Sequence, residues 1–126
     1  MSVDLAVNLS HVFFVGPLFI YIGMARPDTD VKFFYLLAFL GLFVLIYHSY
    51  RAHNKLKEGN DALINWIHIF FLAPLLFILA GMKRSANPIF FTILLILGIV
   101  TIVYHGAKAT DLKNTETKID GPTIKS

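Results

Sequence analysis

Residues 33–47 read FFYLLAFLGLFVLIY and residues 90–104 read FFTILLILGIVTIVY, with no charged side chain in either stretch. A soluble helical bundle needs a polar stripe on each helix to face water, and neither stretch provides one. Both stretches belong to longer apolar runs, close to the roughly 20 residues that a helix needs to cross the hydrocarbon layer. The pattern therefore predicts helices that span a membrane.

Four apolar runs cover most of the chain, at about 5–25, 32–50, 62–82 and 88–107. Hydrophobic residues make up 56% of the 126 residues, and charged residues make up 15%. Globular proteins carry roughly 25% charged residues, so a soluble fold of this size could not hide so much apolar surface. We predict an all-α integral membrane protein with four transmembrane helices and no soluble catalytic domain.

The chain resembles itself at an offset of 57 residues. This offset aligns HVFFVGPLFIYIG (11–23) with HIFFLAPLLFILA (68–80), and about 15 of about 49 aligned pairs are identical without any gap. Such self-similarity indicates a tandem duplication of one two-helix hairpin. The predicted parts are a first repeat with its connector (1–57), a second repeat (58–109) and a polar, disordered tail (110–126).

The predicted topology follows from the repeats and from the charges. Two helices return the chain to its starting side, so the repeats are parallel and related by a pseudo-twofold axis along the membrane normal. The connector (51–60) and the polar stretch 108–126 carry seven Lys and Arg, whereas the two hairpin turns carry four. The positive-inside rule then places both termini in the cytoplasm. The sequence has no basic stripe with interleaved aromatic residues, so nothing in it indicates nucleic-acid binding.

The most informative residues are polar positions that recur in both halves. On the first helix Asp4, Asn8 and His11 are spaced by four and three residues, which places them on one face. The aspartates have an alternative explanation as helix N-caps. The retained set is Asp4/Asp61, Asn8/Asn65, His11/His68, Pro17/Pro74, Gly41/Gly98, Tyr47/Tyr104 and His48/His105.

Four of these residues, His11, His48, His68 and His105, are expected to lie in one layer near the cytoplasmic surface. Polar groups at membrane depth are costly and usually face a bundle interior or water, which makes a functional site the first hypothesis. The alternative is that each imidazole lies at the interface, half-hydrated and bonded to a carbonyl or to an asparagine. The four histidines are the candidate cofactor-binding residues.

Neutral imidazole is a common metal ligand and the usual axial ligand of haem iron. The first cofactor expected is haem b. Two histidines would hold it, either His11 with His68 or His48 with His105. Gly41 and Gly98 would leave room for the macrocycle, or would serve close helix packing. The layout is similar to that of four-helix b-type cytochromes, which implies electron transfer, although two-haem members carry ligands on both membrane sides.

Other functions fit the same residues. A divalent metal such as Zn²⁺ could bind the four histidines, with Asn8, Asn65, Asp4 and Asp61 orienting the imidazoles. A pH-responsive proton or ion channel and a cofactor-free structural or assembly protein are further alternatives. The sequence contains no cysteine, no Ser-His-Asp arrangement, no HExxH motif and no phosphate loop. No motif therefore indicates an enzyme. The expected partners are the lipid bilayer and a homo-oligomer or a larger membrane complex.

Overall fold

The computed structural model describes residues 1–119 and residue 121, all of them in helices or short connections. The elements are α1 (Val3–Ser10), η1 (His11–Val15), α2 (Gly16–Ala25), η2 (Arg26–Asp28), α3 (Val31–Lys57), α4 (Leu63–Ile67), η3 (His68–Leu72), α5 (Ala73–Met82), η4 (Lys83–Ser85) and α6 (Pro88–Ile119). Here η1 and η3 are π-helical turns, whereas η2 and η4 are 3₁₀ turns.

The predicted all-helical fold with four long apolar helices is confirmed. Four helical segments have the length and composition to cross a membrane: Val3–Asp28, Val31–Lys57, Leu63–Ser85 and Pro88–Ile119. We call them the first to fourth spans. At 1.5 Å per residue the 27-residue α3 is about 40 Å long, which exceeds the ~30 Å hydrocarbon thickness. α3 is therefore longer than a membrane crossing requires, and the excess length corresponds to its polar C-terminal turns.

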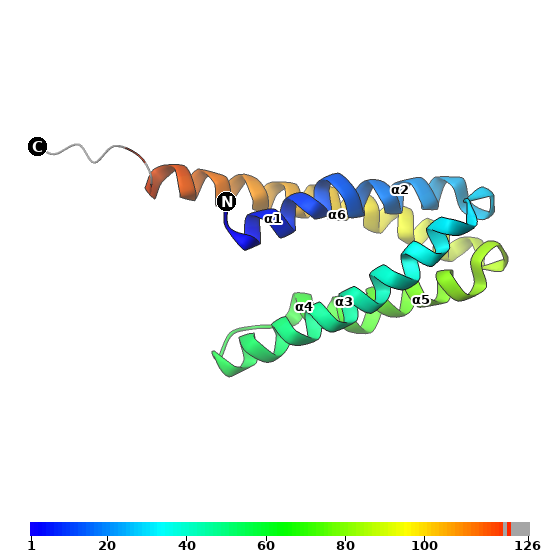
Figure 1. The fold of residues 1–126 in the computed structure, drawn as a ribbon, viewed down its shortest axis with the longest axis horizontal. Coiled ribbons are helices and arrows are strands. Elements are labelled where there is room, and N and C mark those ends of the chain that lie inside the picture. The colour runs from blue at the N-terminus through cyan, green and yellow to red at the C-terminus, as the bar shows by residue number, and fades with distance from the viewer. Residues whose placement is uncertain (120, 122–126) are drawn as a thin grey trace, which may run out of the picture. The chain divides into compact units, whose positions relative to one another are not determined.

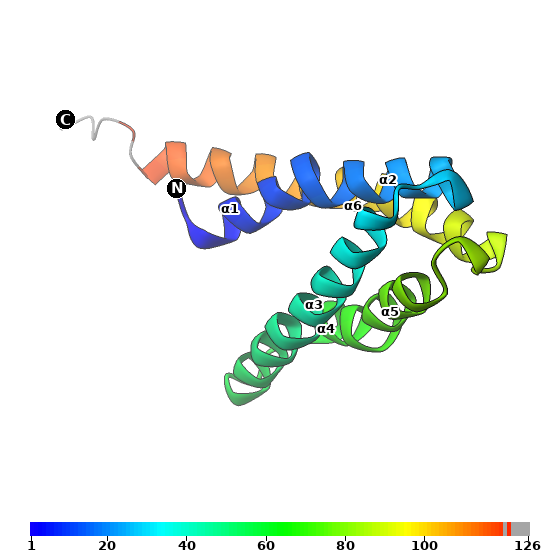
Figure 2. The same ribbon diagram turned by 45° about the vertical axis from the view of Figure 1, so that its right-hand side comes forward.

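The spans form two compact units. Unit 1 comprises Met1–Met24 and Thr92–Ser126, and unit 2 comprises Ala25–Phe91. In unit 1 the consecutive helices α1 and α2 run beside α6, and in unit 2 α3 runs beside α4 and α5 (Figures 1 and 2). Each unit therefore combines one span from each half of the sequence, whereas the predicted repeats 1–57 and 58–109 group consecutive spans.

Glycines set how closely the helices of unit 1 approach. A Cβ atom added to Gly23 would lie 2.6 Å from the Cβ of Leu95. A Cβ atom on Gly98 would lie 2.8 Å from Cγ1 of Ile20 and 2.9 Å from the carbonyl oxygen of Gly16. Real Cβ atoms do not come this close to other atoms, so the absence of a side chain lets α6 contact α2 backbone to backbone.

Unit 2 packs around α3. The ring of Phe77 would lie 3.1 Å from a Cβ atom on Gly41, so this glycine too is at a helix contact. Farther along α3, the buried Ala52 packs with Ala62 and Ile69 from the segment that follows the connector. These small and apolar side chains close the end of unit 2 from which the connector leaves.

Two polar turns belong to unit 2 and use the same chemistry: η2 joins the first span to the second, and η4 joins the third to the fourth. Arg26 and Lys83 begin the 3₁₀ turns with positive φ angles of 53° and 51°. Two residues then cap the helices that follow: the side chain of Asp30 accepts from Lys32 N–H at 3.1 Å, and that of Asn87 accepts from Ile89 N–H at 3.0 Å. Each cap satisfies a backbone donor that the first helical turn leaves unpaired.

Replacing Asp30 with alanine should destabilise the protein by about 1 kcal/mol, because the Lys32 N–H loses its acceptor. Thermal unfolding in detergent micelles, followed by far-ultraviolet circular dichroism, measures the change. Asp28→Ala is the matched control, since Asp28 lies in the same turn but does not cap α3. Equal losses for the two variants would contradict the capping role.

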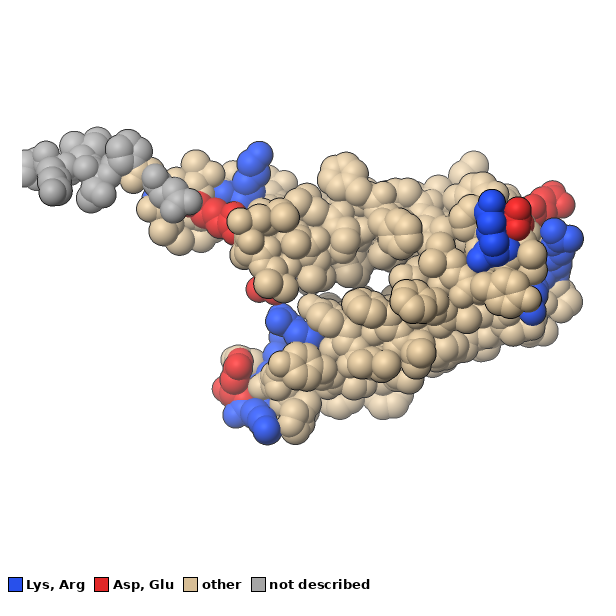
Figure 3. All heavy atoms as spheres, in the orientation of Figure 1, with Lys and Arg blue, Asp and Glu red and all other residues tan. Residues whose placement is uncertain are grey.

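The surface of unit 2 is apolar between charged ends. In Figure 3 the Lys, Arg, Asp and Glu side chains of this unit gather at the turns η2 and η4 and at the connector end, and the surface between them carries no charge. Large apolar side chains are exposed there, among them Phe70, which is 74% exposed. A soluble protein rarely exposes so much contiguous apolar surface, whereas a lipid-facing helix does.

The structure differs from the sequence-based prediction at the C-terminal tail. Residues 110–119, predicted to be disordered, continue α6 as helix. Threonine hydroxyls support this extension: Thr110 donates to the Gly106 carbonyl and Thr115 to the Asp111 carbonyl, each at 3.0 Å. The helix is already nucleated by the fourth span, so each further residue adds a hydrogen bond without a new nucleation cost. Residues 120 and 122–126 lie outside the described residues.

Candidate histidine site

Two of the candidate histidines meet in unit 1. His11 opens the π turn η1, and His105 lies on α6. Their rings are stacked, with centroids 4.1 Å apart and planes inclined by 22°. Helix packing alone brings these residues together, because 94 positions separate them in the sequence.

An asparagine orients one ring of this pair. The Nδ1–H of His105 donates to Oδ1 of Asn8 at 2.7 Å. The amide of Asn8 is itself held, because its Nδ2 donates to the Asp4 carbonyl oxygen at 2.7 Å. Asn8 is only 6% exposed, so these hydrogen bonds replace those that the amide and imidazole would make with water.

Unit 2 contains the same arrangement, built from residues 57 positions away. His48 on α3 and His68 at the start of η3 are stacked, with ring centroids 4.0 Å apart and planes inclined by 13°. The Nδ1–H of His48 donates to Oδ1 of Asn65 at 3.0 Å. The arrangement differs in one atom: Nδ2 of Asn65, a residue 4% exposed, has no hydrogen-bond partner within the described part of the chain.

The other histidine of each pair is bonded to its own helix. Nδ1 of His11 lies 2.7 Å from the Val7 carbonyl oxygen, and Nδ1 of His68 lies 2.7 Å from the Ile64 carbonyl oxygen. A carbonyl oxygen can only accept, so Nδ1 carries the proton in both rings. In the neutral form Nε2 then holds the lone pair, which is the state in which imidazole binds a metal.

All four histidines therefore have the same tautomer. His48 and His105 donate from Nδ1 to an amide oxygen, and His11 and His68 donate from Nδ1 to a backbone oxygen. Hydrogen bonds that fix Nδ1–H are the usual partners of histidines that ligate metals through Nε2. In each unit two imidazoles could thus offer Nε2 to a metal ion.

The π turns place the first and third spans' histidines. In η1 the Gly16 N–H donates to the carbonyl of His11, five residues back, and in η3 the Ala73 N–H donates to the carbonyl of His68. Pro17 and Pro74 follow directly and cannot donate, so the wider turn relieves the clash between the proline ring and the preceding helix. π turns frequently mark functional sites.

The spacing within a pair suits an ion better than a macrocycle. A ring nitrogen of His11 lies within 4.8 Å of one of His105. Zn–N bonds of about 2.0–2.1 Å in a tetrahedron separate two ligating nitrogens by about 3.4 Å. Because the Nε2 lone pair lies in the ring plane, the two stacked rings would have to tilt toward each other before both could bind one ion. Rings stacked at contact distance leave no space for a porphyrin between the members of one pair. The bis-imidazole pairings His11–His68 and His48–His105 join different units and stay predictions.

Of the other candidate residues, the two tyrosines contact the histidine pairs and the two aspartates lie at helix starts. Tyr47 contacts His48 edge-on with centroids 5.3 Å apart, and Tyr104 contacts His105 in the same way at 5.0 Å. Asp4 lies in the first turn of α1, but the N-cap is Ser2, whose Oγ accepts from Leu5 N–H at 3.2 Å. Oδ1 of Asp61 accepts from Leu63 N–H at 2.9 Å at the start of α4.

Sequence reasoning missed two features of the site. It placed Asn8 near His11 on one helix face, but did not foresee that the asparagine bonds a histidine of the distant fourth span. It also did not foresee the π turns, although a proline six residues after each of His11 and His68 was a usable signal. Comparison with protein-family models, curated proteins and solved structures gave no match for this chain.

Proposed function

We propose that this chain is a multi-pass membrane protein that binds divalent transition-metal ions through the histidine pair of each unit, His11 with His105 and His48 with His68. The observation that carries the proposal is the common tautomer of the four imidazoles, each with Nδ1–H bonded to an oxygen. Two neutral imidazoles stacked within each unit supply the nitrogen ligands that Zn²⁺, Ni²⁺ and Co²⁺ prefer. Asn8 and Asn65 orient His105 and His48.

A tandem duplication explains why the contacts recur 57 positions apart. The stacked rings, the asparagine bonds, the π turns and the positive φ angles of Arg26 and Lys83 all occur in pairs with this offset. In the proposed topology the repeats are parallel, with both termini in the cytoplasm. The lipid bilayer surrounds the apolar surface, and further copies or membrane subunits are the proposed protein partners.

Haem b is the second candidate, favoured by the same Nε2 lone pairs, since axial histidines bind haem iron as neutral imidazoles. It would make the chain an electron-transfer protein. A proton or ion path and a structural role remain the alternatives without cofactor. Absorption spectra of the oxidised and reduced protein from haem-replete cells separate these proposals, because haem alone gives a Soret band.

The proposal predicts that tag-free protein in detergent binds Co²⁺ and develops visible d–d absorption, and that Zn²⁺ displaces the Co²⁺. The double variants His11→Ala/His105→Ala and His48→Ala/His68→Ala should each lose their share of the bound Co²⁺. His53→Ala is the matched control, because this fifth histidine is exposed on α3 and belongs to neither pair. A quadruple variant combines the four histidine-to-alanine substitutions. If the wild-type protein bound no more Co²⁺ than this variant, the proposal would be overturned.

A further inference from the structure

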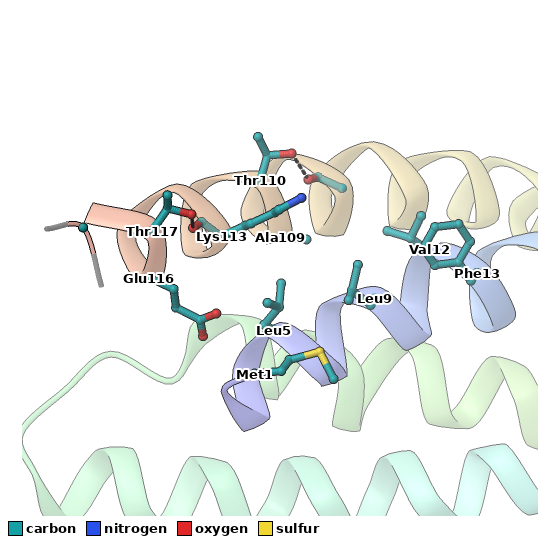
Figure 4. Close-up of a pocket in the computed structure, with 12 residues that line it drawn as sticks. Met1, Leu5, Leu9, Val12, Phe13, Ala109, Thr110, Lys113, Glu116 and Thr117 are labelled. Atoms are coloured by element: carbon teal, nitrogen blue, oxygen red, sulfur yellow. Dashed lines mark hydrogen bonds between the residues drawn. The ribbon is translucent and has the colours of Figure 1, made fainter. Parts of the chain in front are cut away.

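Unit 1 contains a groove that the histidine pairs do not use. It has a volume of about 820 Å³ and lies between α1 with η1 and the C-terminal half of α6 (Figure 4). This volume falls in the range of about 300–1,000 Å³ that is typical of small-molecule sites. The lining residues are Met1, Leu5, Leu9, Val12, Phe13, Gly106, Ala109, Thr110, Lys113, Glu116, Thr117 and Gly121.

The polarity of the lining changes along the groove. The wall from the first span is entirely apolar, with Leu5, Leu9 and Val12 facing α6 (Figure 4). The wall from α6 begins with the small residues Gly106 and Ala109 and becomes polar toward the helix end, at Thr110 and Lys113. An apolar body with a polar end is the pattern of a single membrane amphiphile, with its acyl chain inside and its headgroup at the rim.

Gly106 keeps the groove open. A Cβ atom added there would have a single near neighbour, Cγ2 of Val12 at 3.9 Å, whereas the Cβ of Gly98 would meet atoms at 2.8 Å. Gly98 is therefore required for helix contact, but Gly106 is not. The missing side chain at position 106 leaves free volume that a ligand can fill.

The matching region of unit 2 is closed. The positions 57 residues before Ala109 and after Leu5 and Val12 are Ala52, Ala62 and Ile69, which form a buried cluster. There the connector ties the two helices together, whereas in unit 1 the Ser2 N–H bonds Oε1 of Glu116 at 3.0 Å. Among the described residues, the positions of unit 2 that match the groove are thus filled by buried side chains, so the packing of two such spans does not by itself leave this space.

The charge at the rim selects the headgroup. Lys113 is the cationic side chain among the lining residues, and it is exposed on α6 beside Ala109 (Figure 4). The one acidic lining residue, Glu116, already accepts from Ser2. An ammonium group at the polar end of an apolar groove favours a phosphate, because basic residues near the membrane surface attract anionic lipid headgroups.

We propose that this groove binds one anionic glycerophospholipid, with an acyl chain against Leu5, Leu9 and Val12 and the phosphate beside Lys113. The gradient of polarity, the open space at Gly106 and the rim charge each support this occupant. The site is independent of the proposed metal ligands, none of which lines the groove.

Native mass spectrometry of the full chain in detergent tests the proposal, with phosphatidylglycerol and phosphatidylcholine titrated as probes. Wild-type protein should retain one phosphatidylglycerol in preference to phosphatidylcholine. Gly106→Leu fills the groove and should lower the apparent affinity at least tenfold. Lys113→Gln should lower the affinity for phosphatidylglycerol about fivefold and leave that for phosphatidylcholine unchanged.

Ser49→Leu is the matched control, because Ser49 is exposed and lies 57 positions before Gly106. The Ser49→Leu variant should bind lipid as the wild type does. Far-ultraviolet circular dichroism confirms that both leucine variants are folded. If the Gly106→Leu variant retained as much lipid as the wild type, the proposal that lipid binds in this groove would be overturned. Equal affinity of the wild type for the two lipids, with no effect of Lys113→Gln, would overturn the headgroup assignment.

Discussion

Replacing Gly98 with leucine should prevent the close packing of unit 1, which is the largest loss of stability that we expect from one substitution. Its Cβ atom would lie 2.9 Å from the carbonyl oxygen of Gly16, and a backbone atom cannot move aside as the end of a side chain can. Overpacking of this kind costs about 3 kcal/mol or more. Thermal unfolding in detergent should show a midpoint lower by about 10 °C.

Gly81→Leu is the matched control for this substitution. Gly81 also lies in an apolar helix, but a Cβ atom there would meet nothing within 4 Å, so the change should stay within about 0.5 kcal/mol. A Gly98→Leu variant that unfolds together with the wild type would show that α6 does not approach α2 as closely as described.

The second large effect concerns metal binding. Asn8→Ala should lower Co²⁺ affinity about 10- to 100-fold, although Asn8 is not a proposed ligand. The substitution removes the acceptor of the His105 Nδ1–H, so the imidazole loses both its orientation and its preferred tautomer. Competition titration with a chromophoric chelator measures the affinity.

Asn8→Asp serves as the rescue, since the carboxylate still accepts from His105 and should keep most of the affinity. Asn114→Ala, at an exposed position of α6, should change nothing. If Asn8→Ala lowered the unfolding temperature but left Co²⁺ affinity at the wild-type value, Asn8 would be a packing residue and not an orienting one.

The four spans could be predicted from the sequence because lipid solvates apolar side chains, so hydropathy along the chain decides the fold. The stretch 33–47 and its counterpart 90–104 contain this information locally. The ends of the helices were harder to place. Residues 110–119 look like a tail by polarity alone, and only their continuity with the apolar part of α6 makes them helical.

The sequence showed which histidines belong to the candidate site, but it did not show which of them stack on one another. Repetition at an offset of 57 selected His11, His48, His68 and His105, and the structure stacks them within units as His11 with His105 and His48 with His68. Which ring meets which depends on the packing of spans that are distant in sequence. The contact of Gly98 with Gly16 and the bond from His105 to Asn8 are long-range in the same sense, so no local pattern encodes them.

The composition of the two units has a consequence for biogenesis. Unit 2 is a continuous segment, Ala25–Phe91, so all of its helices have been synthesised by the time Phe91 leaves the ribosome. Unit 1 combines the first span with the fourth, so until the fourth span is synthesised Asn8 lacks the hydrogen bond from His105 and His11 lacks its stacking partner. Helices that enter a membrane singly associate afterwards, so the pairing of the first and fourth spans is expected to be the last step in assembling the fold.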